Sequence, residues 1–237
     1  SRRRHTRYRR SSRGLGDVYK RQSYETAFAM LQAISSTQTI PLARVPWHDP
    51  GLMMKLLDAG AYGLICPMVN SAESAEAFVA ACRYPPRGMR SFGPNRATLY
   101  SDAGSSGDYA AAADAELILL AMIETREGMQ NLDAILSVPG LDGICVGPGD
   151  LSLAFGAPPS MAPSDPTVVA AISSALSAAQ QHNRFAAIHT DGPETAKKRS
   201  AEGFGMCTLQ NDVRLLTDAA KAQVRAIRDD LLHAAFR

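Results

Sequence analysis

Two acidic residues follow two successive apolar segments of the chain, a spacing that suits a shared hard cation. Glu124 follows the segment 117–123, and Asp150 follows the segment 143–146 after a short glycine-rich turn. Neither segment has a helical period, and small or polar residues follow each acid, as at the C-terminal end of a strand in a β/α unit. Oxygen ligands at neighbouring strand ends predict a divalent metal site with positions left for water and substrate.

The turn before the second acid bears on how a substrate would be held. For either acid alone, capping of a helix is the commoner role, but Gly147, Pro148 and Gly149 lead directly into Asp150. Glycine lets backbone N–H groups approach an anion closely. A substrate carboxylate at this turn could also contact the metal, which favours a binding site over two separate helix caps.

Arg44 lies at the end of another apolar segment, where a buried guanidinium must be compensated. An unpaired charge in an apolar site costs several kcal/mol. Pairing with acids in the core is one explanation, and stabilisation of a substrate oxyanion is the other. Because active sites of β/α barrels gather at the C-terminal ends of the strands, we favour the second.

The elements that would position these side chains follow a β/α alternation from Ser23 onward. Helices are predicted to begin at Asp49-Pro50, Asn70-Ser71, Asp165-Pro166 and Gly192-Pro193, and an amphipathic helix at 24–34 precedes the first strand. The alternation predicts a parallel sheet with right-handed crossovers. The six predicted strands are 40–45, 63–68, 117–124, 143–146, 185–189 and 206–209.

Two segments exceed what a crossover needs. A long loop at 84–107 contains several arginines that could bind an acidic substrate or a neighbouring subunit, and we favour a lid or an interface. The last helix, from about Asn211 to Phe236, keeps an apolar stripe over its whole length. Burial of that stripe by association and packing on its own chain are both open, and we expect a homo-oligomer.

Composition and charge narrow the functional classes. Nine of the 25 basic residues lie in 1–22, which leaves 16 basic and 22 acidic residues, a net of about −6, in 23–237 and no nucleic-acid footprint. We interpret 1–22 as an extraneous or disordered basic tail and 23–237 as one domain. Unclustered cysteines (Cys66, Cys82, Cys145 and Cys207) and the lack of a long apolar run predict a soluble cytoplasmic protein without membrane contact.

The motifs resemble those of the HpcH/HpaI aldolase family, metal-dependent class II aldolases acting on pyruvate. The resemblance covers Ser23 to about Leu216, and it implies a (β/α)₈ TIM-type barrel. The pattern of strands shows about six recognisable units and lacks a strand before the helix at 24–34, so we expect an N-terminal truncation. The matching runs are Ile-Glu-Thr-Arg-Glu-Gly-Met, Gly-Pro-Gly-Asp-Leu-Ser, Arg-Val-Pro-Trp, Leu-Leu-Asp-Ala-Gly and Arg-Tyr-Pro-Pro-Arg-Gly-Met-Arg-Ser.

The resemblance also implies roles for individual residues. Glu124 and Asp150 would bind the divalent ion, with Mg²⁺ expected and Mn²⁺ or Co²⁺ as alternatives, and Arg44 would stabilise the pyruvate enolate. The backbone at Gly149 and Asp150 would hold the substrate carboxylate. Asp58 corresponds to an acid that tunes a catalytic histidine across a subunit boundary, although a solvated helix-end acid is the competing view. Met122 stands where some members carry a substrate-binding glutamine.

The general base is missing from this pattern. The family's catalytic histidine follows the second strand, in the region that the arginine-rich segment replaces, and neither His48 nor His189 is assigned that role. We therefore expect weak binding of metal and pyruvate and slow or no turnover. The alternatives are a citrate-lyase β-like or malyl-CoA-type lyase and a non-catalytic barrel fragment.

Overall fold

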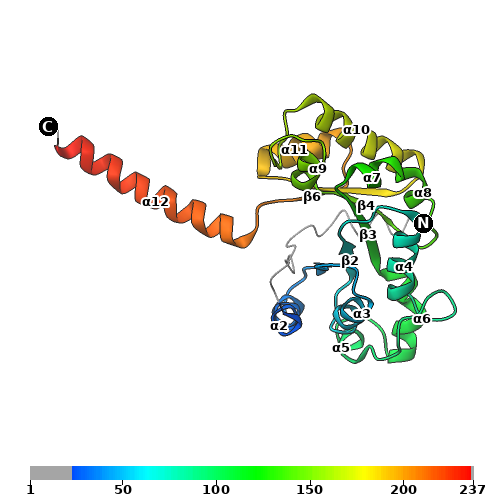
Figure 1. Ribbon diagram of the computed structural model, residues 1–237. Helices are drawn as coiled ribbons and strands as arrows, with labels where there is room; N and C mark the ends of the chain where they lie inside the picture. The colour runs from blue at the N-terminus through cyan, green and yellow to red at the C-terminus, as the bar shows by residue number, and fades with distance from the viewer. Residues whose placement is uncertain (1–22, 236–237) are drawn as a thin grey trace.

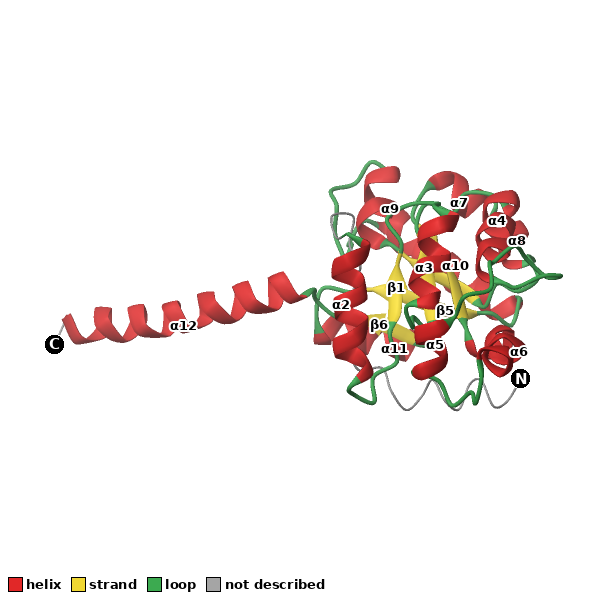
Figure 2. Cartoon of the chain, turned by 90° about the horizontal axis from the view of Figure 1, so that it is seen from below, coloured by secondary structure: helices red, strands yellow, loops and turns green. Residues whose placement is uncertain are grey.

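Six parallel strands form one curled sheet that the helices cover on its outer side (Figures 1 and 2). The computed structural model describes residues 23–235, with side chains up to residue 228. The strands lie in sequence order, each paired in parallel with the next. They are β1 (Leu42–Arg44), β2 (Gly63–Cys66), β3 (Ile118–Ile123), β4 (Gly143–Val146), β5 (Phe185–His189) and β6 (Met206–Thr208).

Helices α3 to α11 lie between successive strands and run back along the outside of the sheet, whereas α2 precedes β1 and α12 follows β6. Their bounds are α2 (Tyr24–Ser35), α3 (Pro50–Asp58), α4 (Ala72–Cys82), α5 (Asn95–Leu99), α6 (Ser106–Glu116), α7 (Arg126–Gln130), α8 (Leu132–Leu136), α9 (Pro148–Ala154), α10 (Pro166–Gln181), α11 (Pro193–Glu202) and α12 (Asp212–Ala235). All six predicted strands are confirmed, shortened at some ends. The eight-stranded closure and the truncation stay predictions.

The helix starts follow from the capping chemistry of the sequence. Oδ1 of Asp49 accepts a hydrogen bond from the backbone of Leu52, and Pro50 occupies the first turn of α3. Asp165 and Pro166 begin α10 in the same way. These contacts satisfy N–H groups that have no acceptor within the helix. They confirm the predicted starts and fix where each crossover leaves the sheet.

The sheet buries side chains on both faces, because residues along a strand alternate between them. The outer face packs against the helices in a large core that includes Leu64, Leu119 and Ile144. The inner face carries a smaller cluster. Its buried members are Leu42, Ile65, Ile118, Leu120, Met122, Cys145 and Ala187.

The long loop between α4 and β3 is held by contacts within the chain. It contains the short helix α5, and Arg90 is 1% exposed with its guanidinium over the rings of Tyr84 and Tyr109. Nη2 of Arg90 lies 2.6 Å from Oδ1 of Asp58. The suggestion that the loop arginines bind substrate is therefore wrong for Arg90, whose charge is used to fix the loop. The lid or interface role of the loop stays a prediction.

Helix α12 extends away from the sheet instead of packing on it (Figures 1 and 2). Leu216 is 75% exposed and Ile227 62% exposed. Of the two explanations for the apolar stripe, packing on its own chain is wrong for the described side chains. The helix spans 212–235, close to the predicted 211–236.

Other expectations concern cysteines, membrane contact and the basic segment. The four cysteines are free, and Cys66, Cys82 and Cys145 are buried. None of the described helices is both long and apolar enough to span a membrane. The interpretation of 1–22 as an extraneous or disordered tail concerns residues outside the described part of the chain. The cytoplasmic location stays a prediction.

Candidate active site

Five of the six predicted site residues line one cavity at the C-terminal ends of the strands. The cavity has a volume of about 390 Å³ and is lined by residues of β1, β2, β3, β5, β6, α9 and the first turn of α12. The predicted residues in its lining are Arg44, Met122, Glu124, Gly149 and Asp150. This size lies within the range of small-molecule sites.

Glu124 is 3% exposed, which is unusual for a carboxylate. Its Oε1 accepts a hydrogen bond of 2.9 Å from the backbone nitrogen of Met68. Burial raises the pKa of the Glu124 carboxyl above its ordinary value, and the negative charge of nearby Asp150 adds to the rise. The N–H of Met68 and the guanidinium of Arg44 act in the opposite direction. The site thus holds Glu124 where a bound cation would stabilise its ionised form.

Asp150 approaches Glu124 from the first turn of α9, and its residue is exposed where Glu124 is buried. The turn before it needs glycine, because a Cβ at Gly147 would lie 2.7 Å from Oε2 of Glu124. A side chain at that position would displace the carboxylate. The glycine-rich turn therefore lets the second acid come close to the first.

The segment after Glu124 is fixed to the loop that follows β2. The Thr125 hydroxyl caps α7 through the N–H of Gly128 and also donates to Oδ1 of Asn70 at 2.6 Å. The side-chain amide of Asn131 donates to the backbone oxygen of Asn70 at 2.8 Å. These contacts explain why polar residues follow the acid in the sequence. They hold the carboxyl end of β3 against the neighbouring strand.

Arg44 and Met122 complete the inner side of the cavity. Arg44 is 6% exposed, and its charge lowers the pKa of Glu124, so the guanidinium lies within electrostatic reach of the carboxylates. Met122 is 1% exposed and belongs to the inner cluster. Its thioether makes this part of the lining apolar.

Asp58 is the predicted residue that does not join the cavity. It ends α3, which runs antiparallel to the strand before it, so Asp58 lies towards the N-terminal end of the sheet. Its carboxylate pairs with Arg90, so the view of a merely solvated acid is wrong. The catalytic role across a subunit boundary stays a prediction.

Sequence reasoning left His189 and Thr208 without a role, yet both line the cavity. Each ends a strand and follows inward-facing residues at a spacing of two, as in Phe185, Ala187 and His189. That spacing was the signal available in the sequence. The contribution of Met68 could not be predicted from its residue type, because its backbone makes the contact.

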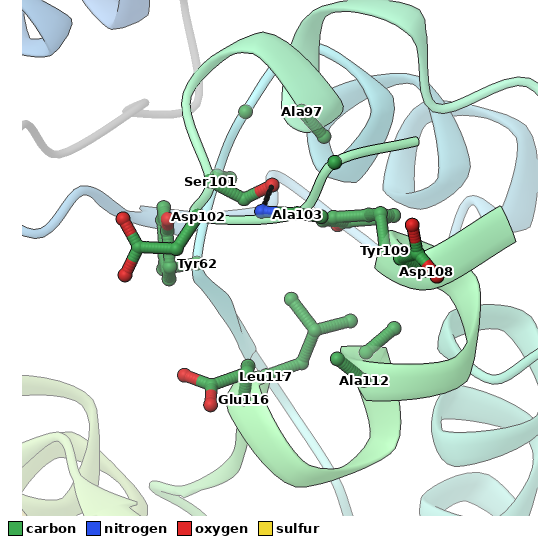
Figure 3. Close-up of a pocket in the computed structure, with 14 residues that line it drawn as sticks. Tyr62, Ala97, Ser101, Asp102, Ala103, Asp108, Tyr109, Ala112, Glu116 and Leu117 are labelled. Carbon is green, nitrogen blue, oxygen red and sulfur yellow. Dashed lines mark hydrogen bonds between the residues drawn. The ribbon is translucent and has the colours of Figure 1, made fainter. Parts of the chain in front are cut away.

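A second cavity, of about 410 Å³, lies near the opposite end of the sheet (Figure 3). It is formed by residues just before β2 and β3, among them Tyr62 and Leu117. In Figure 3, Asp108 lies across the cavity from Asp102 and Glu116, so the three carboxylates do not converge. It therefore offers no ligand set comparable to that of Glu124 and Asp150.

The donor set of the first cavity fits a hard divalent ion. Within the described part of the chain, no group of three or more His, Cys, Asp or Glu side chains forms a metal cluster. The two carboxylates of Glu124 and Asp150 would supply part of the coordination of an oxygen-ligated ion. A chelating substrate and water can fill its other positions. Burial, with the negative charge of Asp150 as a smaller cause, raises the pKa of Glu124, and a bound cation would favour the ionised form of this carboxyl.

The chain is similar to named aldolases in sequence and to a solved structure in fold. The chain is 41% identical to a hydroxypyruvate/pyruvate aldolase of Rhizorhabdus wittichii over 84% of this chain and 78% of that one. It is 36% identical to a 4-hydroxy-2-oxo-heptane-1,7-dioate aldolase of Escherichia coli over 84% of this chain and 74% of that one. The crystal structure of an HpcH/HpaI aldolase/citrate lyase family protein from Burkholderia cenocepacia shares the fold.

That structure superposes with a TM-score of 0.82 at 24% identity, covering 96% of this chain and 91% of the other. A family model matches residues 19–219, which is most of the chain. The chain belongs to the HpcH/HpaI aldolase/citrate lyase family.

Proposed function

We propose that this chain cleaves and forms 4-hydroxy-2-oxo acids through a pyruvate enolate, using a divalent ion held by Glu124 and Asp150. The observation that carries the proposal is the convergence of these carboxylates and Arg44 on one cavity. The aldolase class rests on relatives at 36–41% identity over most of the chain. Because these relatives bear aldolase names, the citrate-lyase-like alternative has less support.

The carboxylates and the guanidinium of the cavity would have different roles in the reaction. Glu124 and Asp150 supply oxygen ligands for Mg²⁺, with Mn²⁺ and Co²⁺ as substitutes of similar preference. When bound, the ion would supply Lewis acidity towards the keto oxygen of the substrate. Arg44 would donate to the same region, where negative charge develops as the carbon–carbon bond breaks. Charges that are already in position in a buried site stabilise this developing negative charge, because no groups have to reorient during the reaction.

The substrate carboxylate would lie against the first turn of α9. Gly149 and Asp150 stand there, where backbone N–H groups have no acceptor within the helix. The thioether of Met122 is only a weak hydrogen-bond acceptor, so the inner end of the cavity would accept an apolar part of the substrate. The other half of the substrate is a small aldehyde.

We also propose that α12 assembles the chain into a homo-oligomer. Its exposed apolar residues are spaced along one helix of 24 residues, and single exposed apolar residues need no explanation whereas a continuous stripe does. A second copy of the same chain carries the same apolar stripe and is present wherever the first copy is, so we propose it as the partner. Association would remove the stripe from water.

The test is metal-dependent decarboxylation of oxaloacetate, which generates the same enolate without cleaving an aldol bond. In Glu124→Gln and Asp150→Asn, Mn²⁺ binding measured by calorimetry is expected to weaken by about 100-fold or more, with loss of decarboxylation. Arg44→Lys keeps the charge but loses the planar fork, and it is expected to lower kcat by about 10-fold or more with metal affinity retained.

Glu127→Gln is the matched control, because Glu127 is an exposed acid three residues from Glu124. It is expected to behave as the unchanged protein. Wild-type chain that binds Mn²⁺ no better than the Glu124→Gln variant would exclude the proposed site. Bound metal without decarboxylation would support the non-catalytic barrel instead.

A further inference from the structure

The inner face of β5 and β6 ends in a pair of polar residues that the proposed enolate chemistry does not use. His189 and Thr208 are register partners on these adjacent parallel strands. Nδ1 of His189 lies 2.5 Å from Oγ1 of Thr208. A hydrogen bond to one ring nitrogen fixes the orientation of an imidazole and the tautomer it adopts. The strand ends therefore hold this histidine in a defined position.

The pair lies in the same cavity as the carboxylates. His189 ends β5 and Glu124 follows β3, so one strand, β4, separates them. Side chains from alternate strands of a curled sheet meet across its inner face. Charged and titratable groups line this cavity from several elements, namely Arg44, Glu124, Asp150, Cys207, Asp212 and Arg214.

None of these groups suits proton transfer at neutral pH as well as His189 does. Glu124 and Asp150 are the metal ligands of the proposed function, Asp212 is an exposed acid in the first turn of α12, and arginines stay protonated. Burial raises the pKa of the Cys207 thiol. His48 does not line the cavity, and its Nε2 donates to the backbone oxygen of Pro67 at 2.7 Å. Among the described residues, His189 is the histidine that this cavity contains.

We propose that His189 is the acid–base group for the C4 hydroxyl of the substrate, with Thr208 as its positioning residue. This inference rests on the proposed aldolase function. In the required tautomer, Nδ1–H donates to Thr208 and Nε2 carries the lone pair that meets the hydroxyl. His189 ends β5, two strands from β3, so it can meet the aldehyde half of a substrate whose keto acid is held by Glu124 and Asp150.

The proton and electrons balance within the cavity. In cleavage, Nε2 takes the hydroxyl proton, the C4–O bond becomes a carbonyl, and the C3–C4 bond breaks. The electron pair of that bond forms the pyruvate enolate, and the aldehyde leaves. In aldol addition the imidazolium returns the proton to the new alkoxide. General acid–base catalysis of this kind contributes about 10²–10⁴-fold to a rate.

The experiment compares two reactions of the same 237-residue chain with Mn²⁺. Cleavage of 4-hydroxy-2-oxopentanoate needs removal of a hydroxyl proton, whereas decarboxylation of oxaloacetate does not. His189→Gln is expected to lower the ratio of the cleavage rate to the decarboxylation rate by about 100-fold or more. The acidic limb of the pH profile of kcat/KM for cleavage should disappear with it.

The positioning role of Thr208 is tested with a conservative pair. Thr208→Val removes the hydroxyl at similar volume. It is expected to lower the ratio of the cleavage rate to the decarboxylation rate by about 10-fold and to shift the acidic limb of the kcat/KM profile for cleavage. Thr208→Ser keeps the hydroxyl and should restore both. His182→Gln is the control, because His182 pairs with Asp133 outside the cavity.

The outcomes separate this inference from the function on which it rests. A His189→Gln variant that keeps the wild-type ratio overturns the inference, and so does one that loses both reactions equally. A wild-type chain without metal-dependent decarboxylation would overturn the proposed function itself. Cleavage above the metal-only background, lost selectively in His189→Gln, would support the inference and correct the expectation of a chain without a base.

Discussion

The backbone nitrogen of Met68 donates to Oε1 of Glu124 across 2.9 Å, and Met68 adopts a left-handed conformation with φ of 53°. Residues other than glycine, asparagine and aspartate rarely adopt this backbone conformation, which costs them roughly 1–2 kcal/mol. Such strain gathers at functional sites, where surrounding contacts maintain it. Here the strained backbone of Met68 directs its N–H group towards the buried carboxylate of Glu124, which we propose as a metal ligand.

The effect of replacing Met68 should therefore depend on how readily the new residue adopts the left-handed backbone conformation. Met68→Gly is expected to keep the Mn²⁺ affinity, because glycine adopts the conformation freely. Met68→Val, with a β-branched side chain, should weaken Mn²⁺ binding by about 10-fold and lower the free energy of unfolding by roughly 1–3 kcal/mol. Calorimetry and chemical denaturation measure the two effects. Equal affinities in both variants would argue against a role for this N–H.

Glu124→Gln should stabilise the metal-free protein at neutral pH. Burial raises the pKa of the Glu124 carboxyl in the folded state, so its ionised form is disfavoured there. The resulting loss of stability develops as pH rises above the ordinary value of 4.5 and is absent well below it. The variant should thus gain stability at pH 7 and not at pH 4 in denaturant titrations.

Metal provides the control for that effect. Saturating Mn²⁺ should stabilise the unchanged protein and leave Glu124→Gln nearly unaffected, because the variant keeps only Asp150 of the two anionic ligands. A variant that is less stable than the unchanged protein at pH 7 without metal would contradict the assigned burial penalty.

Gly147→Ala should disrupt the site through a single methyl group. The added Cβ would lie 2.7 Å from Oε2 of Glu124 and 3.5 Å from Sδ of Met122. We expect overpacking to cost about 1–3 kcal/mol of stability and to abolish measurable Mn²⁺ binding. Gly156→Ala makes a useful comparison, because a Cβ added there would meet nothing within 4 Å, although the φ of 80° adds backbone strain.

The ion pair of Arg90 and Asp58 should contribute more to stability than surface pairs do. Asp58→Asn would leave the buried guanidinium of Arg90 without its anionic partner, at an expected cost of about 3 kcal/mol. Asp114→Asn is the comparison, since its partner Arg87 is 74% exposed, although Asp114 also lies 3.7 Å from Arg83. We expect a smaller loss there, about 1 kcal/mol.

The same Asp58 variant tests the role implied by the family resemblance. If Asp58 acts only through the loop, decarboxylation and cleavage measured below the melting temperature should fall together and modestly. A large loss of cleavage in a protein that remains folded by circular dichroism would support a catalytic contribution instead.

Charged residues on α12 should weaken assembly. Leu216→Glu combined with Ile227→Glu places carboxylates in the exposed apolar stripe and should shift the chain to a smaller species in light scattering. Lys221→Glu alters the net charge by the same amount from an exposed polar position. Its oligomeric state should not change. A wild-type chain that is monomeric at micromolar concentration would contradict association through this helix.

Local patterns in the sequence determined the strands, the helix starts and the two carboxylates. Proline after aspartate begins α3 and α10 by contacts within a few residues, and the strands appear as apolar runs because their side chains are buried on both faces of the sheet. Glu124 and Asp150 were identifiable because each follows such a run. These features depend on neighbours along the chain, so the chain sequence alone encodes them.

Only the tertiary structure decided what segments far apart in the sequence do to one another. Met68 reaches Glu124 across 56 positions, His189 reaches Thr208 across 19, and Arg90 reaches Asp58 across 32. Each contact depends on strand register or on how a loop folds back, which residue types do not specify. For the same reason the apolar stripe of α12 could be predicted from the sequence, whereas its separation from the sheet could not.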